Sequence, residues 1–224
     1  MTDSIAHNIT KVRQRISAAE QKYLRNANSV QLMAVSKTRS AEQVRMAVSA
    51  GVDCLGENYL AEALEKMAAL SDLAISWHFI GPIQSNKTRA IAAHFSWVHS
   101  VDRLKIATRL SQQRPAELGP LNICLQVNVS EEASKSGVAL DQLAPLASQI
   151  AELPQLRLRG LMAIPAASAD LQHQRQQFAL LREAAATIEG CDTLSMGMSG
   201  DLEAAVAEGS TLVRVGTDIF GARG

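Results

Sequence analysis

The stretch LMAVSKT, residues 32–38, places an amine at the end of a buried strand. Four apolar residues in a row are typical of a strand covered on both faces, as in a parallel sheet, and a polar triplet follows at once. Lys37 therefore stands where the strand leaves the core. We predict that its amine faces a ligand; a strand-end lysine that reaches out to solvent is the alternative.

The same pattern, an apolar run followed by a turn and a helix, recurs along the chain. Eight runs are predicted as strands, at 31–37, 53–58, 77–81, 97–101, 122–129, 157–164, 193–198 and 212–217. Segments with helical periodicity lie between them, at 41–51, 59–70, 86–95, 102–113, 139–153, 171–188 and 200–209. Strands that alternate with helices indicate a parallel sheet, and eight such units are the number in a (β/α)8 TIM barrel.

One further helix is predicted before the first strand, where apolar residues recur at intervals of three and four: Ile5, Ile9, Val12, Ile16 and Ala19. No stretch has the composition of a linker. The predicted fold is therefore an α/β (β/α)8 TIM barrel with an additional N-terminal helix, forming a single domain over residues 1–224. An open doubly wound sheet is the alternative, but no G-x-G-x-x-G motif follows the first strand.

Composition excludes several partners. Lysine plus arginine and aspartate plus glutamate number 22 each, so no net charge attracts nucleic acid or an anionic membrane. No apolar run approaches the length needed to span a bilayer, and the first residues lack the apolar core of a signal peptide. Cys54, Cys124 and Cys191 show no C-x-x-C spacing and are predicted to be small apolar residues of the core. We expect a cytoplasmic protein.

In a TIM barrel, ligands bind at the carboxyl ends of the strands. Polar residues and glycines do collect where the predicted strands end: Ser36 and Lys37, Glu57 and Asn58, Gly81, His99 and Ser100, Asn128, Met198 to Gly200, and Arg214 to Thr217. This distribution predicts a ligand site at that end of the barrel.

The run MGMSGD at 196–201 offers a site for an anion. Ser199 and Gly200 lie between a predicted strand and a predicted helix, where backbone N–H groups, a hydroxyl and the helix dipole favour negative charge. Ser199 or Asp201 can also serve as an ordinary helix cap. The two interpretations are compatible.

The run RVGT at 214–217 adds to this site from the last strand. Gly216 lets the backbone approach an anion, Thr217 adds a hydroxyl, and loops after the last two strands of TIM barrels frequently bind phosphate. Barrel closure brings the last strand beside the first, which carries Lys37. An amine, a phosphate site and an arginine at one rim describe a pyridoxal phosphate site, in which a protein group faces the pyridine nitrogen. A Schiff-base aldolase for sugar phosphates would use the first two features without Arg214.

The sequence resembles the pyridoxal phosphate homeostasis proteins, a family similar to the N-terminal barrel of bacterial alanine racemase. The resemblance covers nearly the whole chain. It is carried, in order and spacing, by VSKT (35–38), GENYLAEALEK (56–66), WHFIGPIQSNK (77–87), HSVD (99–102), QVNVSEEASKSG (126–137), LRGLMAI (158–164) and LSMGMSGDLEAAVAEGSTLVRVGTDIFG (194–221).

This resemblance implies that pyridoxal phosphate is bound as a Schiff base on Lys37. It places Arg214 near the pyridine nitrogen and the other binding residues around the phosphate or beside the ring. The phosphate residues are Ser199, Gly200, Gly216 and Thr217, and the ring residues are Asn58 and Ile80. The resemblance further implies a carrier or regulator of the cofactor in vitamin B6 and amino-acid homeostasis, without robust catalytic activity.

Low activity also follows from the residues. An arginine facing the ring nitrogen leaves that nitrogen unprotonated, which weakens the cofactor as an electron sink. Racemisation needs a second acid or base opposite Lys37, and neither Tyr23 nor Tyr59 follows a strand convincingly. A weak racemase or lyase that uses Lys37 is the alternative. We expect a monomer, with pyridoxal phosphate-dependent apoenzymes as possible recipients of the cofactor.

Other motifs carry less information. Three histidines show no recognised spacing for a metal site: His78, His94 and His99. Lys87 and Lys135 lie in predicted loops, where they either attract the anionic cofactor or are simply solvated. HSVD at 99–102 lacks the G-x-S-x-G motif of a serine hydrolase, and Asp102 is predicted to be a helix N-cap.

Overall fold

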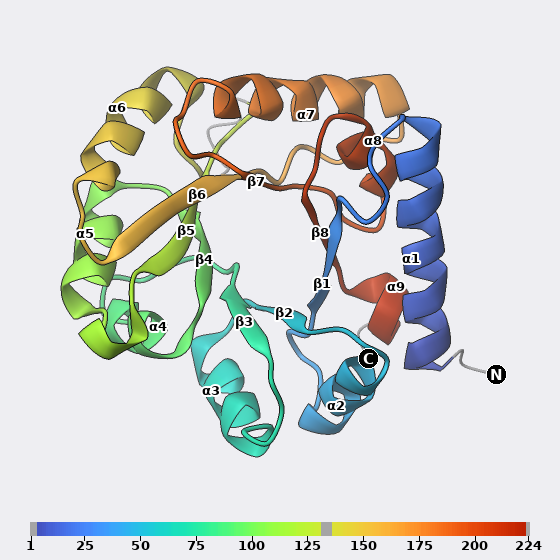
Figure 1. Ribbon diagram of the computed structural model, residues 1–224, viewed down its shortest axis with the longest axis horizontal. Helices are drawn as coiled ribbons and strands as arrows, with labels where there is room; N and C mark the ends of the chain where they lie inside the picture. The colour runs from blue at the N-terminus through green and yellow to red at the C-terminus, as the bar shows by residue number, and fades with distance from the viewer. Residues whose placement is uncertain (1–3, 131–135, 223–224) are drawn as a thin grey trace.

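A computed structural model of the chain describes residues 4–130 and 136–222. Eight parallel strands close into a barrel in which each strand pairs with the next and β8 pairs with β1. Figure 1 shows them as an inner ring surrounded by helices. The strands are β1 (Gln31–Val35), β2 (Cys54–Glu57), β3 (Ser76–Phe79), β4 (Trp97–Val101), β5 (Leu121–Gln126), β6 (Leu156–Met162), β7 (Thr193–Ser195) and β8 (Leu212–Val215). The predicted TIM barrel is confirmed, and the open sheet is excluded.

Helices follow the strands in the predicted alternation. The predicted helices are present as α2 (Ala41–Ser49), α3 (Leu60–Ala69), α4 (Thr88–His94), α5 (Leu104–Gln113), α6 (Leu140–Ala151), α7 (Leu171–Ala185) and α8 (Leu202–Ala207). Two short helices were not predicted: the 3-10 helix η1 (Ala116–Leu118) and α9 (Thr217–Phe220). The α9 helix begins at Thr217, within the RVGT motif that is predicted to contribute to the ligand site.

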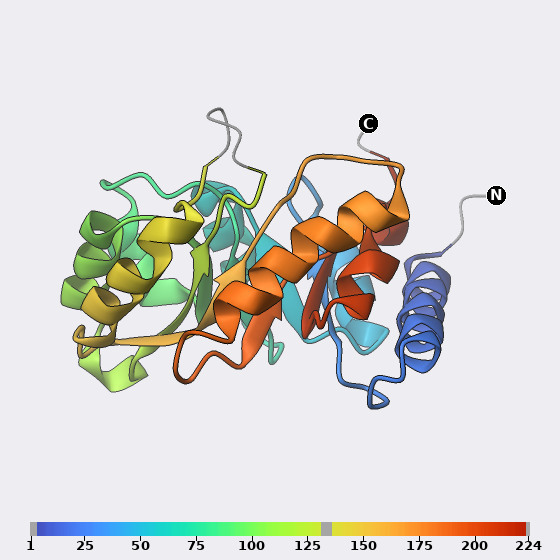
Figure 2. The same ribbon diagram turned by 90° about the horizontal axis from the view of Figure 1, so that it is seen from above.

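The additional N-terminal helix is confirmed as α1 (Ile5–Lys22). Ser4 caps it, because its Oγ accepts a hydrogen bond of 3.2 Å from the backbone N–H of His7. Ile9, Val12 and Ile16 are buried, as their spacing predicts. The helix packs against α8 and α9, and Figures 1 and 2 show it standing outside the ring beside both.

Helix starts show where local sequence signals decided the structure and where they did not. At α2, Ser40 and Gln43 form a reciprocal capping box. At α5, the N-cap position is Arg103, so the prediction that Asp102 caps this helix is wrong. The chain stays extended through Arg103, and the Asp102 carboxylate pairs with the Arg103 guanidinium at 2.6 Å instead.

Several strands end earlier than predicted, and each early end belongs to a loop at the carboxyl end of the barrel. The strand predicted to Lys37 ends at Val35, and Thr38 has a left-handed backbone with φ of +63°. The strand predicted to 198 ends at Ser195, because the chain turns at Gly197 with φ of +97°. The last strand ends at Val215. The residues that were predicted as strand but lie beyond these ends form the loops at the carboxyl end of the barrel.

Two apolar layers hold the barrel together. A large buried cluster fills the space between strands and helices and includes Ala34, Leu55 and Val98. A small cluster, formed by Met33, Cys54 and Leu212 with Ile80 packed against it, is separate from it. Side chains alternate between the two faces of a strand, so neighbouring β1 residues Met33 and Ala34 belong to different layers. The small cluster therefore fills the interior of the barrel.

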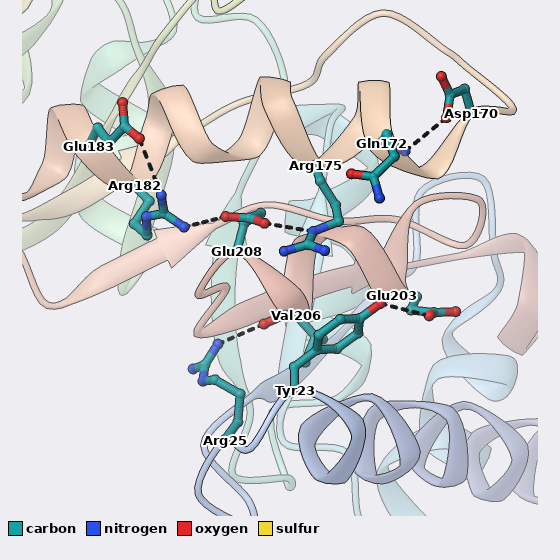
Figure 3. A network of polar contacts seen from close by, with 10 residues as sticks. All are labelled: Tyr23, Arg25, Asp170, Gln172, Arg175, Arg182, Glu183, Glu203, Val206 and Glu208. Carbon is teal, nitrogen blue, oxygen red and sulfur yellow. Dashed lines mark hydrogen bonds and ion pairs between the residues drawn. The ribbon is translucent and has the colours of Figure 1, made fainter.

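A polar network ties α7 and α8 to α1 (Figure 3). The Glu208 carboxylate, just after α8, accepts a hydrogen bond of 2.7 Å from Arg175 and pairs also with Arg182, both on α7. The Glu203 carboxylate on α8 accepts a hydrogen bond of 3.0 Å from the Tyr23 hydroxyl, which follows α1. These contacts fix α8, which begins directly after the predicted anion-binding loop.

The cysteines are free thiols, and burial raises the pKa of all three. Cys54 and Cys124 are buried as predicted, whereas Cys191 is half-buried. Across the described residues, no helix is both long and apolar enough to cross a membrane.

Candidate functional site

A cavity of about 250 Å³ lies at the carboxyl end of the barrel. All eight residues predicted to bind the cofactor line it: Lys37, Asn58, Ile80, Ser199, Gly200, Arg214, Gly216 and Thr217. They follow β1, β2, β3 and β7 or belong to β8 and the residues after it. The structure therefore brings together residues that are up to 180 positions apart in the sequence.

Pairing of β8 with β1 creates this cavity. In the register of the two strands, Arg214 lies opposite Met33 and Val215 opposite Ala34. Arg214 and Gly216 consequently lie beside the turn that contains Lys37. A Cβ atom at Gly216 would lie 3.2 Å from the carbonyl oxygen of Val35, which is closer than most Cβ contacts. Glycine therefore lets the two backbones approach closely here, and a side chain would require a shift of a few tenths of an ångström.

Lys37 sits in a tight turn directly after β1. The Ser36 N–H donates to the carbonyl oxygen of Gly56 on β2 (3.0 Å), and the Arg39 N–H donates to the carbonyl oxygen of Ser36 (3.1 Å). The Lys37 side chain is half-buried and lines the cavity. Because Thr38 has a left-handed backbone that β-branched residues rarely adopt, the turn has an unusual conformation next to the amine.

A buried polar network surrounds this turn and was not anticipated from the sequence. The Ser36 hydroxyl donates to Glu57 Oε1 (2.6 Å), and Lys66 Nζ donates to the same oxygen (2.6 Å) and to the Ser36 carbonyl oxygen (2.5 Å). Glu62 pairs with Lys66 at 2.5 Å and accepts a hydrogen bond of 2.5 Å from the Thr38 N–H. Burial raises the pKa of Glu57, while Lys66 and Ser36 oppose that rise. The sequence signals were the strand-end positions of Ser36 and Glu57 and the i,i+4 spacing of Glu62 and Lys66, and none of them predicts the contacts between these residues.

Arg214 is buried in the wall of the cavity. One of its terminal nitrogens, Nη1, donates to the carbonyl oxygen and the hydroxyl of Ser195, the latter at 2.8 Å. The other, Nη2, donates to the carbonyl oxygen of Ala163 at 2.8 Å. Burial lowers the pKa of Arg214 to about 10, so the side chain remains a cation at neutral pH. The guanidinium is thus held rigidly between β6 and β7, and it can donate hydrogen bonds but accept none.

Arg15 of α1 contacts the loop that carries Ser199 and Gly200. This arginine donates to the Ser199 carbonyl oxygen (2.7 Å) and pairs with Asp218 of α9 (2.5 Å). It therefore fixes the loop after β7 relative to the residues after β8. The additional helix has a role at the site that its amphipathic pattern did not reveal.

The predicted contribution of a helix dipole at Ser199 is small. The α8 helix begins at Leu202, two residues after Gly200, and has six residues, while α9 begins at Thr217 and has four. Asp201 occupies the N-cap position of α8 but makes no capping bond to it; its Oδ1 accepts from the Met198 N–H at 2.5 Å. The case for anion binding therefore rests on the loop backbones and hydroxyls.

Asn58 and Ile80 line the opposite side of the cavity from sequence positions after β2 and β3. Asn58 Oδ1 is buried and has no hydrogen-bond partner among the described residues. A buried, unsatisfied amide oxygen is unfavourable unless a ligand or water supplies a donor. Gly81 lets the backbone after β3 lie against the backbone of Asn58, since a Cβ at this position would lie 2.2 Å from the Asn58 carbonyl oxygen.

Four lining residues are not among the eight predicted to bind the cofactor, although Met198 was included among the strand-end residues: Val35, Arg39, Ile164 and Met198. Arg39 donates to the carbonyl oxygen of Gly221 at 2.5 Å, which ties the Lys37 turn to the end of α9. Ile164 and Met198 are exposed apolar residues at the mouth. Each lies within two residues of a predicted site residue or of a strand end, which is the signal that could have found them.

Other residues singled out in the sequence lie elsewhere. Lys87 is exposed at the start of α4 and does not line the cavity, and Lys135 lies outside the described residues. Ser100 is used structurally, because its hydroxyl donates to the Gly81 carbonyl oxygen at 2.5 Å. Within the described residues, no group of three or more histidine, cysteine, aspartate or glutamate side chains could hold a metal ion.

Two of the histidines instead form a buried pair. His78 Nδ1 and His99 Nε2 are 2.9 Å apart, and the other ring nitrogen of His78 is 3.0 Å from the Ser76 hydroxyl. Burial lowers the pKa of His78 to about 3 and that of His99 well below its usual value. Both rings are neutral at physiological pH. They belong to the barrel interior rather than to the cavity.

Comparison with known proteins identifies the family. The family described as "Alanine racemase, N-terminal domain" matches residues 1–224. A relative from Pseudomonas aeruginosa, named pyridoxal phosphate homeostasis protein, is 62% identical over 221 residues, or 98% of this chain and 96% of the relative. A relative of the same name from Escherichia coli is 51% identical over 231 residues, or 99% and 97%. The chain belongs to the pyridoxal phosphate homeostasis protein family.

Solved structures extend this comparison. The family member resembles PipY of Synechococcus elongatus with pyridoxal phosphate bound, with a TM-score of 0.84 and 36% identity over 97% of this chain and all of PipY (100%). Alanine racemase from Corynebacterium glutamicum has a TM-score of 0.73 at 17% identity and is matched over 61% of its own length by 98% of this chain. The racemase shows a shared fold. The resemblance inferred from the sequence motifs is confirmed.

Proposed function

We propose that this member of the family binds pyridoxal phosphate as a Schiff base on Lys37 and carries or buffers the cofactor in vitamin B6 and amino-acid homeostasis. The observation that carries the proposal is the convergence of all eight predicted residues on one cavity. The described lining also holds three cationic side chains, Lys37, Arg39 and Arg214, and no carboxylate. Such a lining suits a phosphorylated aldehyde.

The residues present fit this cofactor. Ser199 and Thr217 offer hydroxyls, and Gly200 and Gly216 let the backbone approach the phosphate. At Gly200 a Cβ would meet nothing within 4 Å, so the space beside it is open. The unsatisfied Oδ1 of Asn58 can accept a hydrogen bond from a donor such as the hydroxyl on the ring of the cofactor. These features support binding independently of the names of the relatives.

The residues of the lining support carrying rather than catalysis. When bound, the cofactor supplies an aldehyde for linkage to an amine and a pyridine ring that accepts electrons. Arg214 can only donate to a ring nitrogen, which favours the unprotonated ring and weakens that electron acceptor. The described lining contains no tyrosine, histidine, cysteine or carboxylate side chain that could exchange protons opposite Lys37.

A carrier of the cofactor needs proteins that receive it. We infer that the recipients are pyridoxal phosphate-dependent apoenzymes, reached by a monomer in the cytoplasm. Exposed Ile164 and Met198 leave one side of the cavity open to exchange. Balanced charge on the chain supports the expectation that nucleic acid and membranes are not partners.

A transfer assay tests this function. The protein is loaded with pyridoxal phosphate, freed of excess cofactor and mixed with an apo-aminotransferase. We expect the aminotransferase to regain activity while the visible absorbance of the loaded protein falls by a matching amount. Separate incubations with single amino-acid enantiomers should show no racemisation or cleavage. Sustained turnover that disappears in Lys37→Ala would contradict the carrier function and favour the enzyme.

A further inference from the structure

The buried ion pairs beside β2 do more than stabilise the fold, because they bond to the turn that presents Lys37. Lys66 Nζ donates to the Ser36 carbonyl oxygen at 2.5 Å, on the residue before Lys37. Glu62 accepts from the Thr38 N–H at 2.5 Å, on the residue after it. Lys66 joins the two sides, since it pairs with Glu62 at 2.5 Å. Lys37 is thus clamped by its two neighbours.

The turn needs such a clamp. Thr38 has φ of +63°, a left-handed conformation that is strained for a β-branched residue and persists only where the surroundings impose it. The hydrogen bond from its N–H to Glu62 is one such constraint. On the other side, the Ser36 hydroxyl is bonded to Glu57 Oε1 at 2.6 Å, and that oxygen also accepts from Lys66.

Stability alone is a poor explanation for this arrangement. The side chains of Lys66 and Glu57 are 5% and 0% exposed, and removing two charges from water offsets most of their attraction. Packed apolar residues of similar size would stabilise the fold about as well. Apolar side chains could not bond to the Ser36 carbonyl or the Thr38 N–H. The polar contacts to the turn are therefore the feature that only this network provides.

We propose that Lys66, with Glu57 and Glu62, is a positioning residue that holds the Lys37 turn so that the amine meets the cofactor aldehyde. This inference rests on the proposed function. In the step concerned, the neutral amine forms a C–N bond to the aldehyde carbon, and the carbonyl oxygen leaves as water with the two amine protons, giving C=N. Lys66 acts on this step through the backbone of the turn and contacts no reacting atom.

The test separates linkage from simple binding. Lys66→Met removes the donor but keeps the length of the side chain, and Arg45→Met breaks the exposed Arg45–Asp72 pair on neighbouring α2 as a matched control. Stopped-flow absorbance gives the rate of Schiff-base formation with pyridoxal phosphate. Calorimetry with pyridoxine 5′-phosphate, which has an alcohol in place of the aldehyde, gives binding without linkage. Circular dichroism establishes that each variant is folded.

We expect Lys66→Met to form the Schiff base at least about tenfold more slowly, because misplaced reacting groups lose much of the benefit of orientation. Binding of pyridoxine 5′-phosphate should stay within about twofold, and Arg45→Met should change neither quantity. A wild-type rate in folded Lys66→Met would overturn the proposal. An equal loss in both assays would also overturn it, because the network would then shape the whole cavity.

A second pair of variants decides the matter should Lys66→Met not fold. Glu62 is 28% exposed, so its replacement is better tolerated. Glu62→Ala removes the acceptor for the Thr38 N–H and should slow linkage, whereas Glu62→Gln keeps an oxygen there and should restore most of the rate. Equal rates in both variants would overturn the proposal. Failure of the wild-type protein to form any Schiff base would instead refute the proposed function itself.

Discussion

The two ends of the barrel both contain a cavity, and comparing them shows why we assign ligand binding to the carboxyl end. The cavity at the amino end is the larger, about 350 Å³ against about 250 Å³ at the carboxyl end. Its lining includes Arg159, whose charge is satisfied by Asp192 through hydrogen bonds of 2.9 and 3.0 Å from Nε. Arg159 also lies over the Trp97 ring at 5.0 Å. The larger volume therefore does not indicate which of the two cavities binds a ligand.

Charge does distinguish them. The described lining at the amino end has one arginine and one aspartate, which cancel, whereas the carboxyl end has three cations and no carboxylate. At the carboxyl end, Arg214 donates its hydrogen bonds to neutral oxygens of Ser195 and Ala163, and the Asp201 carboxylate that interacts with its charge lies outside the lining. In TIM barrels the amino end generally serves stability and the carboxyl end function. The following predictions test that division.

The largest effect is expected at Lys37. Lys37→Ala should abolish the visible absorbance of the Schiff base completely, because no other amine of the described lining can form it. The fold should be kept, since the half-buried side chain lines a cavity. Absorbance and circular dichroism measure the two properties. Lys87→Ala, at the exposed start of α4, is the matched control, and an unchanged visible band in Lys37→Ala would contradict the assignment.

Arg214→Glu should shift the cofactor spectrum, because a carboxylate beside the ring nitrogen favours its protonation. It should also destabilise the protein by roughly 2–5 kcal/mol, since the carbonyl oxygens of Ser195 and Ala163 lose their donors. Absorbance of the loaded variant and urea unfolding measure these changes. Arg159→Gln, at the other end of the barrel, should lower stability with the spectrum unchanged. An unshifted spectrum in Arg214→Glu would remove Arg214 from the ring nitrogen.

Gly216→Ala should weaken phosphate binding by about tenfold. The added Cβ would lie 3.2 Å from the Val35 carbonyl oxygen, so one of the two backbones must shift by a few tenths of an ångström beside the cavity. Calorimetry with pyridoxine 5′-phosphate measures the loss. Gly119→Ala tests glycine replacement remote from the cavity, where a Cβ meets nothing within 4 Å, although its φ of +65° will reduce stability. Affinity equal to wild type in Gly216→Ala would show that this close approach of β8 and β1 is not part of the site.

The smallest effect near neutral pH concerns the buried histidines, because their contribution appears only as the pH falls below 6.5. Burial lowers the pKa of His78 from 6.5 to about 3, so between these values the unfolded chain binds a proton that the folded protein does not. Stability should therefore fall as the pH falls from 6.5 toward 3, by about 1.4 kcal/mol per pH unit for this residue. Urea unfolding at several pH values should show a shallower decline in His78→Gln than in the wild type. An equal decline, or an equal change in exposed His173→Gln, would contradict this.

The fold and the gathering of the predicted residues at one cavity could be predicted because their signals are local. Eight apolar runs with helices between them specify the barrel, and Lys37 and Arg214 are polar residues at the ends of such runs. Barrel closure then requires them to be neighbours. The strand ends were less predictable, because the residues from Ser36 to Thr38 leave the sheet through contacts made by distant side chains.

The supporting residues could not be predicted for the same reason. Glu57 appears in the sequence as one more polar residue at a strand end, and Lys66 as the partner of Glu62 on a helix surface. Their bonds to the Lys37 turn depend on how α3 packs beside β1 and β2. Arg15 likewise belongs to the polar face of α1, and its bridge between two loops depends on where that helix docks.

The most direct test of the central claim is borohydride reduction of the loaded protein, followed by absorbance and by mass spectrometry of the peptide that contains Lys37. The account predicts a visible band that reduction abolishes and a pyridoxyl group left on Lys37 alone. A protein that stays colourless and unmodified after addition of pyridoxal phosphate, or one modified on a different lysine, would contradict it.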